Sequence, residues 1–275
     1  MNMKSKTSIR ISALKSIPEL RAVEELQKEA WEMGDRDLVP VAHLAAVKEA
    51  GGILIGAYDG GTLAGFAYGF MGMEEGRVTF HSHLLAVKPA YRNQDLGRQL
   101  KLEQRERALA KGITLMTWTF DPLQSRNAHL NLGKLGVVSE KYLIDFYGEA
   151  SSSFLHRTGT DRLWVSWWLD SERVRRRIEG GAAESPLPEL PEPLVEMSDE
   201  DSPLRNDRVL IERPPRVAIR IPADLVALQQ RDPALAVSWR ESTRWAFTEA
   251  LAAGYLVEEF YRGGRYGIYL LRSLD

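Results

Sequence analysis

The 275-residue chain contains no cysteine. This absence excludes disulfide bonds, thiolate metal ligands and a cysteine nucleophile. No apolar run approaches the roughly 20 residues that a membrane-spanning helix needs, and the first residues lack the apolar centre of a signal peptide. We therefore expect a cytoplasmic protein with no membrane partner.

An excess of charge of either sign is also missing. The 36 Lys and Arg residues nearly balance the 38 Asp and Glu residues, which gives a net charge of −2. Nothing in this balance points to a nucleic-acid partner. With 44% hydrophobic and 27% charged residues, the composition is typical of a globular protein with a sizeable core.

The most informative segment runs from position 81 to position 98. An apolar strand, 81–87, is followed by a turn at Pro89, a polar loop over 92–95 and a helix. A strand–loop–helix connection of this kind directs backbone N–H groups and a helix N-terminus toward one point, which suits a pyrophosphate group.

Two histidines, His81 and His83, lie on the strand that leads into this loop. Residues two apart on a strand share a face, and an imidazole suits the removal of a proton from an ammonium group at neutral pH. Two other interpretations stay open at this point. The histidines are half-buried structural side chains, or they bind a metal, although no third ligand lies nearby in the sequence.

The remaining pattern predicts an α+β protein with a mixed sheet. A helix capped by Ser16 follows a short first strand, and a second helix over 40–50 precedes a three-strand meander. Further strands are expected at 114–120, 140–147 and 163–169, with helices at 97–111 and 125–135.

The motif Val87, Arg92, Leu96 and Gly97 resembles the acetyl-CoA-binding motif of the GNAT N-acetyltransferase superfamily, and the order of elements is similar. The strand with His81 and His83 looks most like the arylalkylamine N-acetyltransferases. The resemblance implies a GNAT acyl-CoA N-acyltransferase fold with acetyl-CoA as co-substrate. It also implies a small-molecule or peptide amine as acceptor, with a homodimer as a possible assembly.

The same resemblance implies a set of residues that bind the cofactor. Backbone groups of the strand would pair with the pantetheine arm, and amides of the loop would hold the pyrophosphate, with Arg92 and Arg98 adding charge-assisted bonds. One departure is Asp95, which stands where the family has a glycine. The cofactor-binding residues implied in this way are Leu85, Ala86, Val87, Arg92, Asn93, Gln94, Asp95, Leu96, Gly97, Arg98, Ser125 and Asn127.

Catalytic roles follow from the resemblance too. His83 is the favoured base, with His81 assisting through water. Asp121 either binds the substrate ammonium or accepts its proton, or it is a turn residue, since Asp-Pro is turn chemistry. The tyrosine that usually protonates the CoA thiolate is Leu132 here. Tyr147 or Tyr142 would replace it, or the thiolate leaves unassisted or through water; of the two, we select Tyr147.

The sequence predicts three regions: a GNAT domain over 1–170, a Pro- and acid-rich linker over 171–207, and a small α+β segment over 208–275. About 70 residues form a marginal core, so the last segment is expected to pack on the first domain or on a partner subunit. A second functional class stays open because of Asp95 and Leu132, namely a non-catalytic GNAT-fold module that binds acyl-CoA or regulates another protein.

Overall fold

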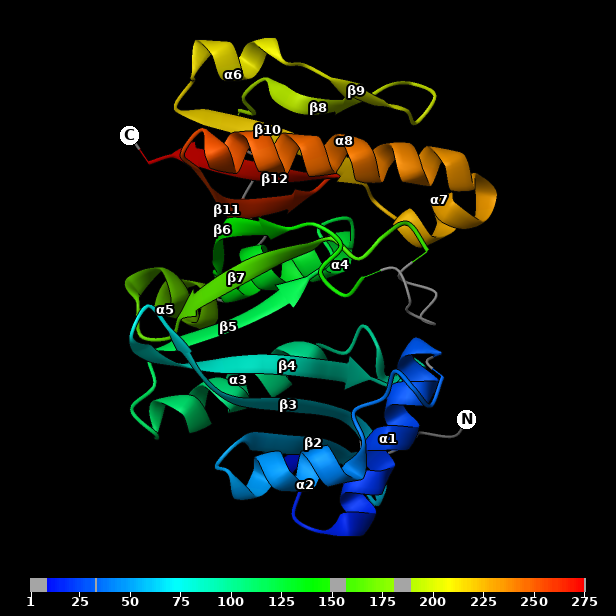
Figure 1. Cartoon of the computed structure of the whole chain (residues 1–275), viewed down its shortest axis with the longest axis vertical. Helices are drawn as coiled ribbons and strands as arrows, with labels where there is room; N and C mark the ends of the chain where they lie inside the picture. Colours follow the sequence, from blue (N-terminus) through cyan, green and yellow to red (C-terminus); the bar gives the residue numbers. More distant parts are fainter. Residues whose placement is uncertain (1–8, 33, 149–156, 181–188, 275) are drawn as a thin grey trace, which may run out of the picture. The chain divides into compact units, whose positions relative to one another are not determined.

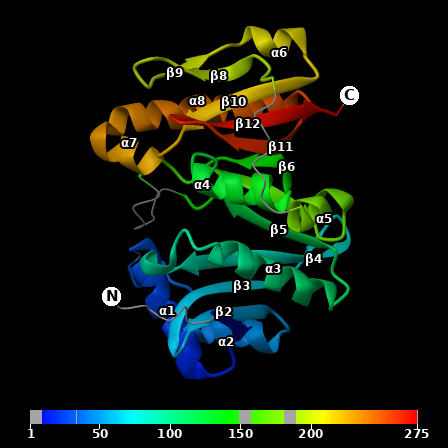
Figure 2. The same cartoon turned by 180° about the vertical axis from the view of Figure 1, so that it is seen from behind.

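The computed structural model describes residues 9–32, 34–148, 157–180 and 189–274 (Figures 1 and 2). The chain divides into two compact units. Unit 1 holds the described residues up to Thr117, and unit 2 holds the described residues from Trp118 onward. The division falls within one strand, β5(Leu115–Phe120).

Unit 1 is built on a sheet in the order β1-β2-β3-β4-β5. Neighbouring strands are antiparallel except for β4 and β5, which pair in parallel through Phe80 with Met116 and His81 with Thr117. The other strands are β1(Arg10–Ala13), β2(Ile53–Asp59), β3(Thr62–Glu74) and β4(Arg77–Val87).

Helices cover both faces of this sheet. Helices α1(Ile17–Trp31) and α2(Val41–Glu49) lie in front of the strands in Figure 1, and α3(Leu96–Leu109) covers the opposite face in Figure 2. Ser16 begins α1 as expected, because its hydroxyl accepts the Glu19 N–H while the Glu19 carboxylate accepts the Ser16 N–H. Burial of apolar side chains fixes α1 and α2 on the sheet; the central ones are Leu20, Val23, Leu26, Leu44, Leu54, Phe66 and Tyr68.

Strand β4 contains one residue more than the part of β3 that faces it. Tyr68 pairs with Leu84, but Phe70 pairs with His81, so two steps along β3 correspond to three along β4. Such a β-bulge bends a strand and redirects its side chains. Gly69 lies at this step, where an added Cβ would be 2.5 Å from the His81 carbonyl oxygen.

Unit 2 continues from the end of β5 in the strand order β7-β6-β11-β12-β10-β8-β9. Its strands are β6(Val138–Leu143), β7(Arg162–Trp168), β8(Pro193–Met197), β9(Pro203–Arg205), β10(Arg216–Pro222), β11(Tyr255–Arg262) and β12(Tyr266–Ser273). Its helical segments are α4(Ser125–Ala128), the π-helical η2(His129–Leu135), α5(Glu172–Glu179), α6(Arg208–Glu212), α7(Leu225–Arg231) and α8(Pro233–Ala252).

The last 70 residues contact the preceding part of unit 2 directly. Val257 of β11 pairs with Ser139 of β6, and the Tyr269 hydroxyl of β12 donates to the Pro122 carbonyl over 2.6 Å. The buried indole of Trp239 anchors α8 on the strands. These contacts join the segment to the strands that precede it, while the predicted division into three regions stays a prediction.

Two stretches differ from the elements expected from the sequence. The described parts of the segment predicted as a linker contain β8 and β9 after α5, and β8 pairs in parallel with β10. Pro186 and Pro188 lie outside the described residues. The strand expected over 140–147 ends at Leu143, because Asp145 takes a left-handed φ of 45° that a strand cannot accommodate.

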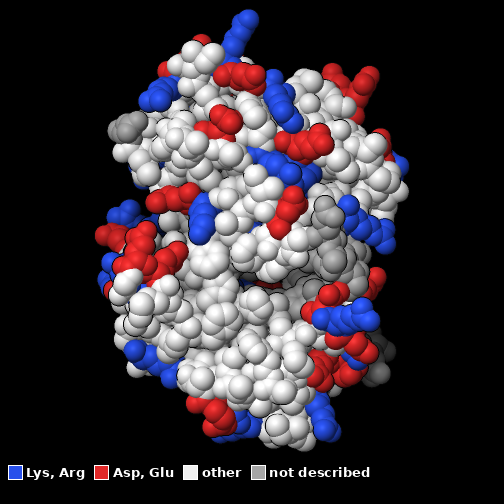
Figure 3. All heavy atoms as spheres, viewed as in Figure 1, with Lys and Arg blue, Asp and Glu red and all other residues white. Residues whose placement is uncertain are grey.

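Charged side chains of both signs are interspersed on the face shown in Figure 3. Exposed ion pairs such as Arg176 with Glu172 are examples of this mixing. None of the helices among the described residues combines the length and apolar character that crossing a membrane requires.

The close approach at Gly69 generates the first prediction. Gly69→Ala places a methyl group against the His81 carbonyl and the Phe80 ring, so the free energy of unfolding should fall by about 1–3 kcal/mol. Gly72→Ala is the matched control on the same strand, since its Cβ would meet only the Thr79 hydroxyl at 3.2 Å. Urea denaturation of both variants measures the difference, and equal losses would contradict the steric argument.

Candidate active site

His81 and His83 lie on one face of β4, as the sequence predicts, within a cluster of aromatic rings. Their ring centroids are 6.0 Å apart. The Phe70 ring packs against both imidazoles, at 5.5 and 5.7 Å, and the Tyr68 ring meets His83 edge-on at 5.7 Å. The two histidines therefore share one largely apolar environment in unit 1.

Burial keeps both imidazoles neutral. It lowers the pKa of His81 to about 4, with smaller contributions from His83 and Lys101. Burial also lowers the pKa of His83, and His43 adds to the effect. A neutral imidazole can accept a proton, so at pH 7 both side chains are in the form that a general base requires. His81 Nδ1 is also 3.1 Å from the Thr117 hydroxyl of β5, which orients its ring.

Two further residues belong to this cluster, and sequence reasoning assigned them no role. His43 of α2 has its Nε2 atom 2.6 Å from the Tyr68 hydroxyl, and the two rings meet edge-on at 6.1 Å. Burial raises the pKa of Tyr68 to about 12, so its hydroxyl stays protonated. Neither residue carries a local motif, and only the packing of α2 on the sheet brings His43 here.

A buried polar chain lies on the opposite face of β4. The Lys101 ammonium of α3 donates to the Ser82 hydroxyl over 2.8 Å, and that hydroxyl donates to Gln104 Oε1, also over 2.8 Å. Burial lowers the pKa of Lys101 well below its usual value. Ser82 sits between the two histidines in sequence, so this chain fixes the part of the strand that carries them.

Beyond the bulge, the backbone N–H and C=O groups of β4 alternate in direction between β3 and the other edge of the strand. Lys88 N–H donates to the Ala64 carbonyl of β3. Because backbone groups alternate along an antiparallel strand, those of Ala86 also point toward β3, and those of Leu85 and Val87 point to the other edge. The Val87 carbonyl accepts a bond from Arg92 Nε over 3.3 Å.

The loop between β4 and α3 turns sharply at two left-handed residues. After the short helix η1(Pro89–Tyr91), Asn93 has a φ of 63° and Asp95 a φ of 59°. Asp95 caps α3 without a side-chain bond, and the helical ladder begins with Gln99 N–H donating to the Asp95 carbonyl. The N–H groups of Leu96, Gly97 and Arg98 therefore point out of the first turn of the helix.

The charged and polar side chains of the loop are held close to the protein. Arg92 donates from Nη2 to the Ala30 carbonyl at the end of α1, over 3.0 Å. Arg98 lies 3.6 Å from the Asp95 carboxylate, and Gln94 donates to the Ala90 carbonyl. Arg98 thus balances the acidic group that stands where the family has a glycine.

The other sequence-predicted residues belong to unit 2. Asp121 is 7% exposed and receives two bonds of 2.8 Å from the Arg240 guanidinium. Its Oδ1 also accepts the Leu123 N–H, so the Asp-Pro sequence forms a turn, one of the two alternatives considered. Sequence reasoning did not foresee Arg240, because it lies 119 positions away.

The helical residues of the predicted site differ in exposure. Ser125 is buried at the start of α4, whereas Asn127, two residues later in the same turn, is exposed. Leu132 is fully buried within η2. An aliphatic side chain therefore fills the core at the position where the family usually has its tyrosine.

Of the two candidate tyrosines, Tyr147 is partly exposed and Tyr142 is not available. The Tyr142 hydroxyl donates to Asp161 over 2.7 Å, and burial raises its pKa far above its usual value. The Tyr147 side chain is 45% exposed, and its hydroxyl is 3.3 Å from the Thr119 hydroxyl of β5. The described residues contain no group of three or more His, Cys, Asp or Glu side chains arranged to hold a metal ion.

Comparison with known proteins finds a family match over part of the chain. Residues 18–134 match the model of the acetyltransferase (GNAT) family. The resemblance and the fold class inferred from the sequence are thereby confirmed: residues 18–134 are similar to the GNAT acetyltransferase family, within an α+β protein that has further C-terminal strands and helices.

Several solved structures are similar to part of the chain. The ribosomal-protein-S18-alanine N-acetyltransferase from Escherichia coli is 16% identical with a TM-score of 0.48, over 60% of this chain and 96% of that one. A putative acetyltransferase from Acinetobacter baylyi is 20% identical with a TM-score of 0.48, over 62% and 97%. A GNAT family acetyltransferase from Elizabethkingia anophelis, with acetyl-CoA bound, is 15% identical with a TM-score of 0.43, over 60% and 99%. No curated protein matches the chain.

The lowered pKa of His81 predicts a pH-dependent stability. Between pH 6.5 and about 4 the unfolded chain binds a proton at this site that the folded chain does not. The free energy of unfolding should therefore decrease as the pH is lowered through this window. This group contributes up to about 1.4 kcal/mol per pH unit. Urea denaturation from pH 7.5 to 4.5 measures the slope, which should become shallower in His81→Asn; an unchanged slope would contradict the assignment.

The backbone at Asp95 predicts a gain on substitution by glycine. Asp95→Gly relieves the backbone strain of a residue with a left-handed φ, and it removes a carboxylate from the helix N-terminus. It should tighten the binding of CoA in calorimetry, because the phosphates no longer approach a carboxylate. Asn93→Gly is the matched control, because it relieves a left-handed residue without removing a charge. Equal CoA affinities in the two variants would show that the charge of Asp95 has no effect.

Proposed function

We propose that this protein is an N-acetyltransferase that transfers the acetyl group of acetyl-CoA to a primary amine by direct attack. One observation carries this proposal. Strand β4 presents two neutral histidines on one face and, six residues after His81, runs into a loop whose amides are directed as a phosphate site requires.

In this proposal, CoA is bound mainly by backbone groups. The pantetheine arm pairs with the outward backbone groups of Leu85 and Val87, beside Ala86. The pyrophosphate accepts bonds from the N–H groups at the start of α3, and Arg98 adds a positive charge that Asp95 partly offsets. Arg92 supports the loop through the Val87 and Ala30 carbonyls. Ser125 and Asn127, on α4, are assigned to the same cofactor.

The base is assigned to His83, with His81 behind it. The substrate ammonium loses a proton to His83, directly or through water, and the amine nitrogen then forms a bond to the thioester carbonyl carbon. The C–S bond breaks, and the sulfur leaves with the electron pair and takes a proton from the acid. The nitrogen loses its second proton to give the neutral amide, and this proton restores the acid through water. His83 suits the role of base because it is neutral at pH 7 and next to a second neutral imidazole that can share the proton.

The acid that returns a proton to the sulfur is assigned to Tyr147. Its hydroxyl lies against Thr119 of β5 and its side chain is partly exposed, whereas the Tyr142 hydroxyl is committed to Asp161. Asp121 has no proton-transfer role in this proposal, because the Arg240 guanidinium occupies its carboxylate; it supports the end of β5 instead.

His83→Ala tests the proposal. Acetyl-CoA is incubated with a panel of primary amines, amino acids and peptides, and thiol release is followed at pH 7. The variant should lower kcat for an accepted amine about 100-fold, with the Kd for acetyl-CoA unchanged in calorimetry.

The defect should shrink toward pH 10, where the amine is already deprotonated. A loss that is equal at every pH would instead indicate a structural role for His83. If acetyl-CoA does not bind at millimolar concentration, or no amine supports thiol release, the proposed function is wrong.

A further inference from the structure

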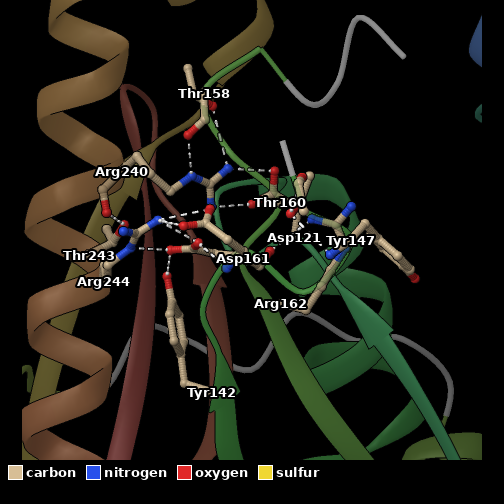
Figure 4. A network of polar contacts seen from close by, with 12 residues as sticks. Asp121, Tyr142, Tyr147, Thr158, Thr160, Asp161, Arg162, Arg240, Thr243 and Arg244 are labelled. Atoms are coloured by element: carbon tan, nitrogen blue, oxygen red, sulfur yellow. Dashed lines mark hydrogen bonds and ion pairs between the residues drawn. The ribbon is translucent and has the colours of Figure 1, made fainter. Parts of the chain in front are cut away.

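Two arginines of α8 each hold a buried aspartate with two hydrogen bonds. Arg240 donates to both oxygens of Asp121 over 2.8 Å, and Arg244 donates to both oxygens of Asp161 over 2.8 and 2.7 Å. Asp161 is fully buried. The arginines are four positions apart, so they project from one face of the helix, as Figure 4 shows.

Each aspartate fixes a different part of unit 2. Asp121 follows the end of β5, two residues after Thr119. Asp161 precedes β7, and its side chain also accepts bonds from the Tyr142 hydroxyl and the Asp145 N–H. Arg240 reaches the same connection from its other side, where its Nε donates to the Thr158 carbonyl.

The segment 145–148, which contains Tyr147, is held in place by this network of hydrogen bonds. Four consecutive N–H groups donate to fixed acceptors: those of Asp145 to Asp161 Oδ1, Phe146 to the Thr160 carbonyl, Tyr147 to the Thr160 hydroxyl and Gly148 to the Asp145 carbonyl. Arg244 also bonds the Asp145 carboxylate over 3.1 Å. The Arg162 guanidinium, itself bonded to the Asp161 carbonyl, lies 4.9 Å from the Tyr147 ring.

Stability alone gives a weak reason for two such ion pairs. The loss of hydration of buried charges offsets much of their attraction, and apolar side chains of similar size stabilise a core about as well. What bidentate pairs provide is fixed geometry. Here they fix the two sides of one contact, the 3.3 Å approach of the Tyr147 hydroxyl to Thr119.

We propose that Arg240 and Arg244 are positioning residues, through which the C-terminal helix α8 holds the Tyr147 hydroxyl in place for proton transfer. This inference rests on the proposed function, because it takes Tyr147 as the acid. Arg240 acts through Asp121 and β5, and Arg244 acts through Asp161 and the 145–148 segment.

Arg244 is the better residue to change, because its side chain is 32% exposed while that of Arg240 is 2% exposed. Arg244→Ala should speed amide hydrogen exchange of residues 145–148 at least tenfold, and Arg244→Lys should do so less. Arg231→Ala is the matched control. Arg231 is an arginine of the same unit whose ion pair, with Asp201, is more exposed to solvent, so this variant should leave the exchange of residues 145–148 unchanged. Unchanged exchange in a folded Arg244→Ala protein would overturn the proposal without any activity measurement.

A double-mutant cycle with Tyr147→Phe separates this inference from the proposed function. Arg244→Ala should lower kcat for thiol release by about 10- to 100-fold with the KM for acetyl-CoA unchanged, and it should have no further effect in Tyr147→Phe. If Tyr147→Phe itself has normal kcat, the assignment of the acid is wrong. If Tyr147→Phe is slow but Arg244→Ala is normal, or the two losses multiply, the positioning role is wrong.

A second substrate distinguishes positioning from a general loss of structure. An acetyl thioester of a more acidic thiol needs less protonation of its leaving group. Both Tyr147→Phe and Arg244→Ala should therefore be less defective with such a thioester than with acetyl-CoA. Equal defects with the two thioesters would contradict a role through the acid.

Discussion

An extra residue in β4, opposite the step from Tyr68 to Phe70 of β3, decides where the functional groups of unit 1 point. On one side of this bulge, His81 pairs with β5 and with β3. On the other side, the backbone groups of Leu85 and Val87 are directed away from β3. A regular strand would keep one alternation along its whole length. His83 could then not pack against Tyr68 and Phe70 while its neighbour Leu84 packs against the apolar core cluster. Gly69 allows this geometry because it brings no side chain to the crossing point.

Each unit contains buried polar or charged side chains, and each of these side chains has a partner that fixes its direction. Lys101 reaches Ser82 behind the histidines, and Arg240 reaches Asp121 at the end of β5. Such groups are costly to bury, and they are satisfied only in one arrangement of the strands. Unit 1 thus combines an apolar histidine environment, which keeps the imidazoles neutral, with a polar chain on the opposite face of the same strand.

Local chemistry made much of unit 1 predictable. The Ser16 cap and the strand-to-helix loop after Val87 each depend on residues close in sequence. The π-helical turn at 129–135 and the early end of β6 were not predictable, because they depend on packing and on a left-handed Asp145. Strands β8 and β9 were not predicted, because the prolines around them are typical of a linker. Strand β8 is recognised by its pairing with β10 and not by a pattern in its own sequence.

The site was predictable in type but not in detail. Spacing placed His81 and His83 on one face, yet nothing local pointed to His43 or Tyr68. From the sequence we selected Tyr147 over Tyr142, but the physical reason to prefer it is visible only in the structure, where the Tyr142 hydroxyl is bonded to Asp161. The role of Asp121 could not be decided from the sequence either. Its partner Arg240 comes from a C-terminal segment to which the sequence assigned no role.

The separation of Asp121 from Arg240 has a consequence for how the chain matures on the ribosome. The partners lie 119 positions apart, so at 5–20 residues per second Arg240 is made about 6–24 s after Asp121. During that interval unit 1 is already complete, while the strands that follow it carry two carboxylates destined for burial and no cation to meet them. Unit 2 can close only when α8 emerges, so the last part of the chain to be synthesised completes strands made much earlier.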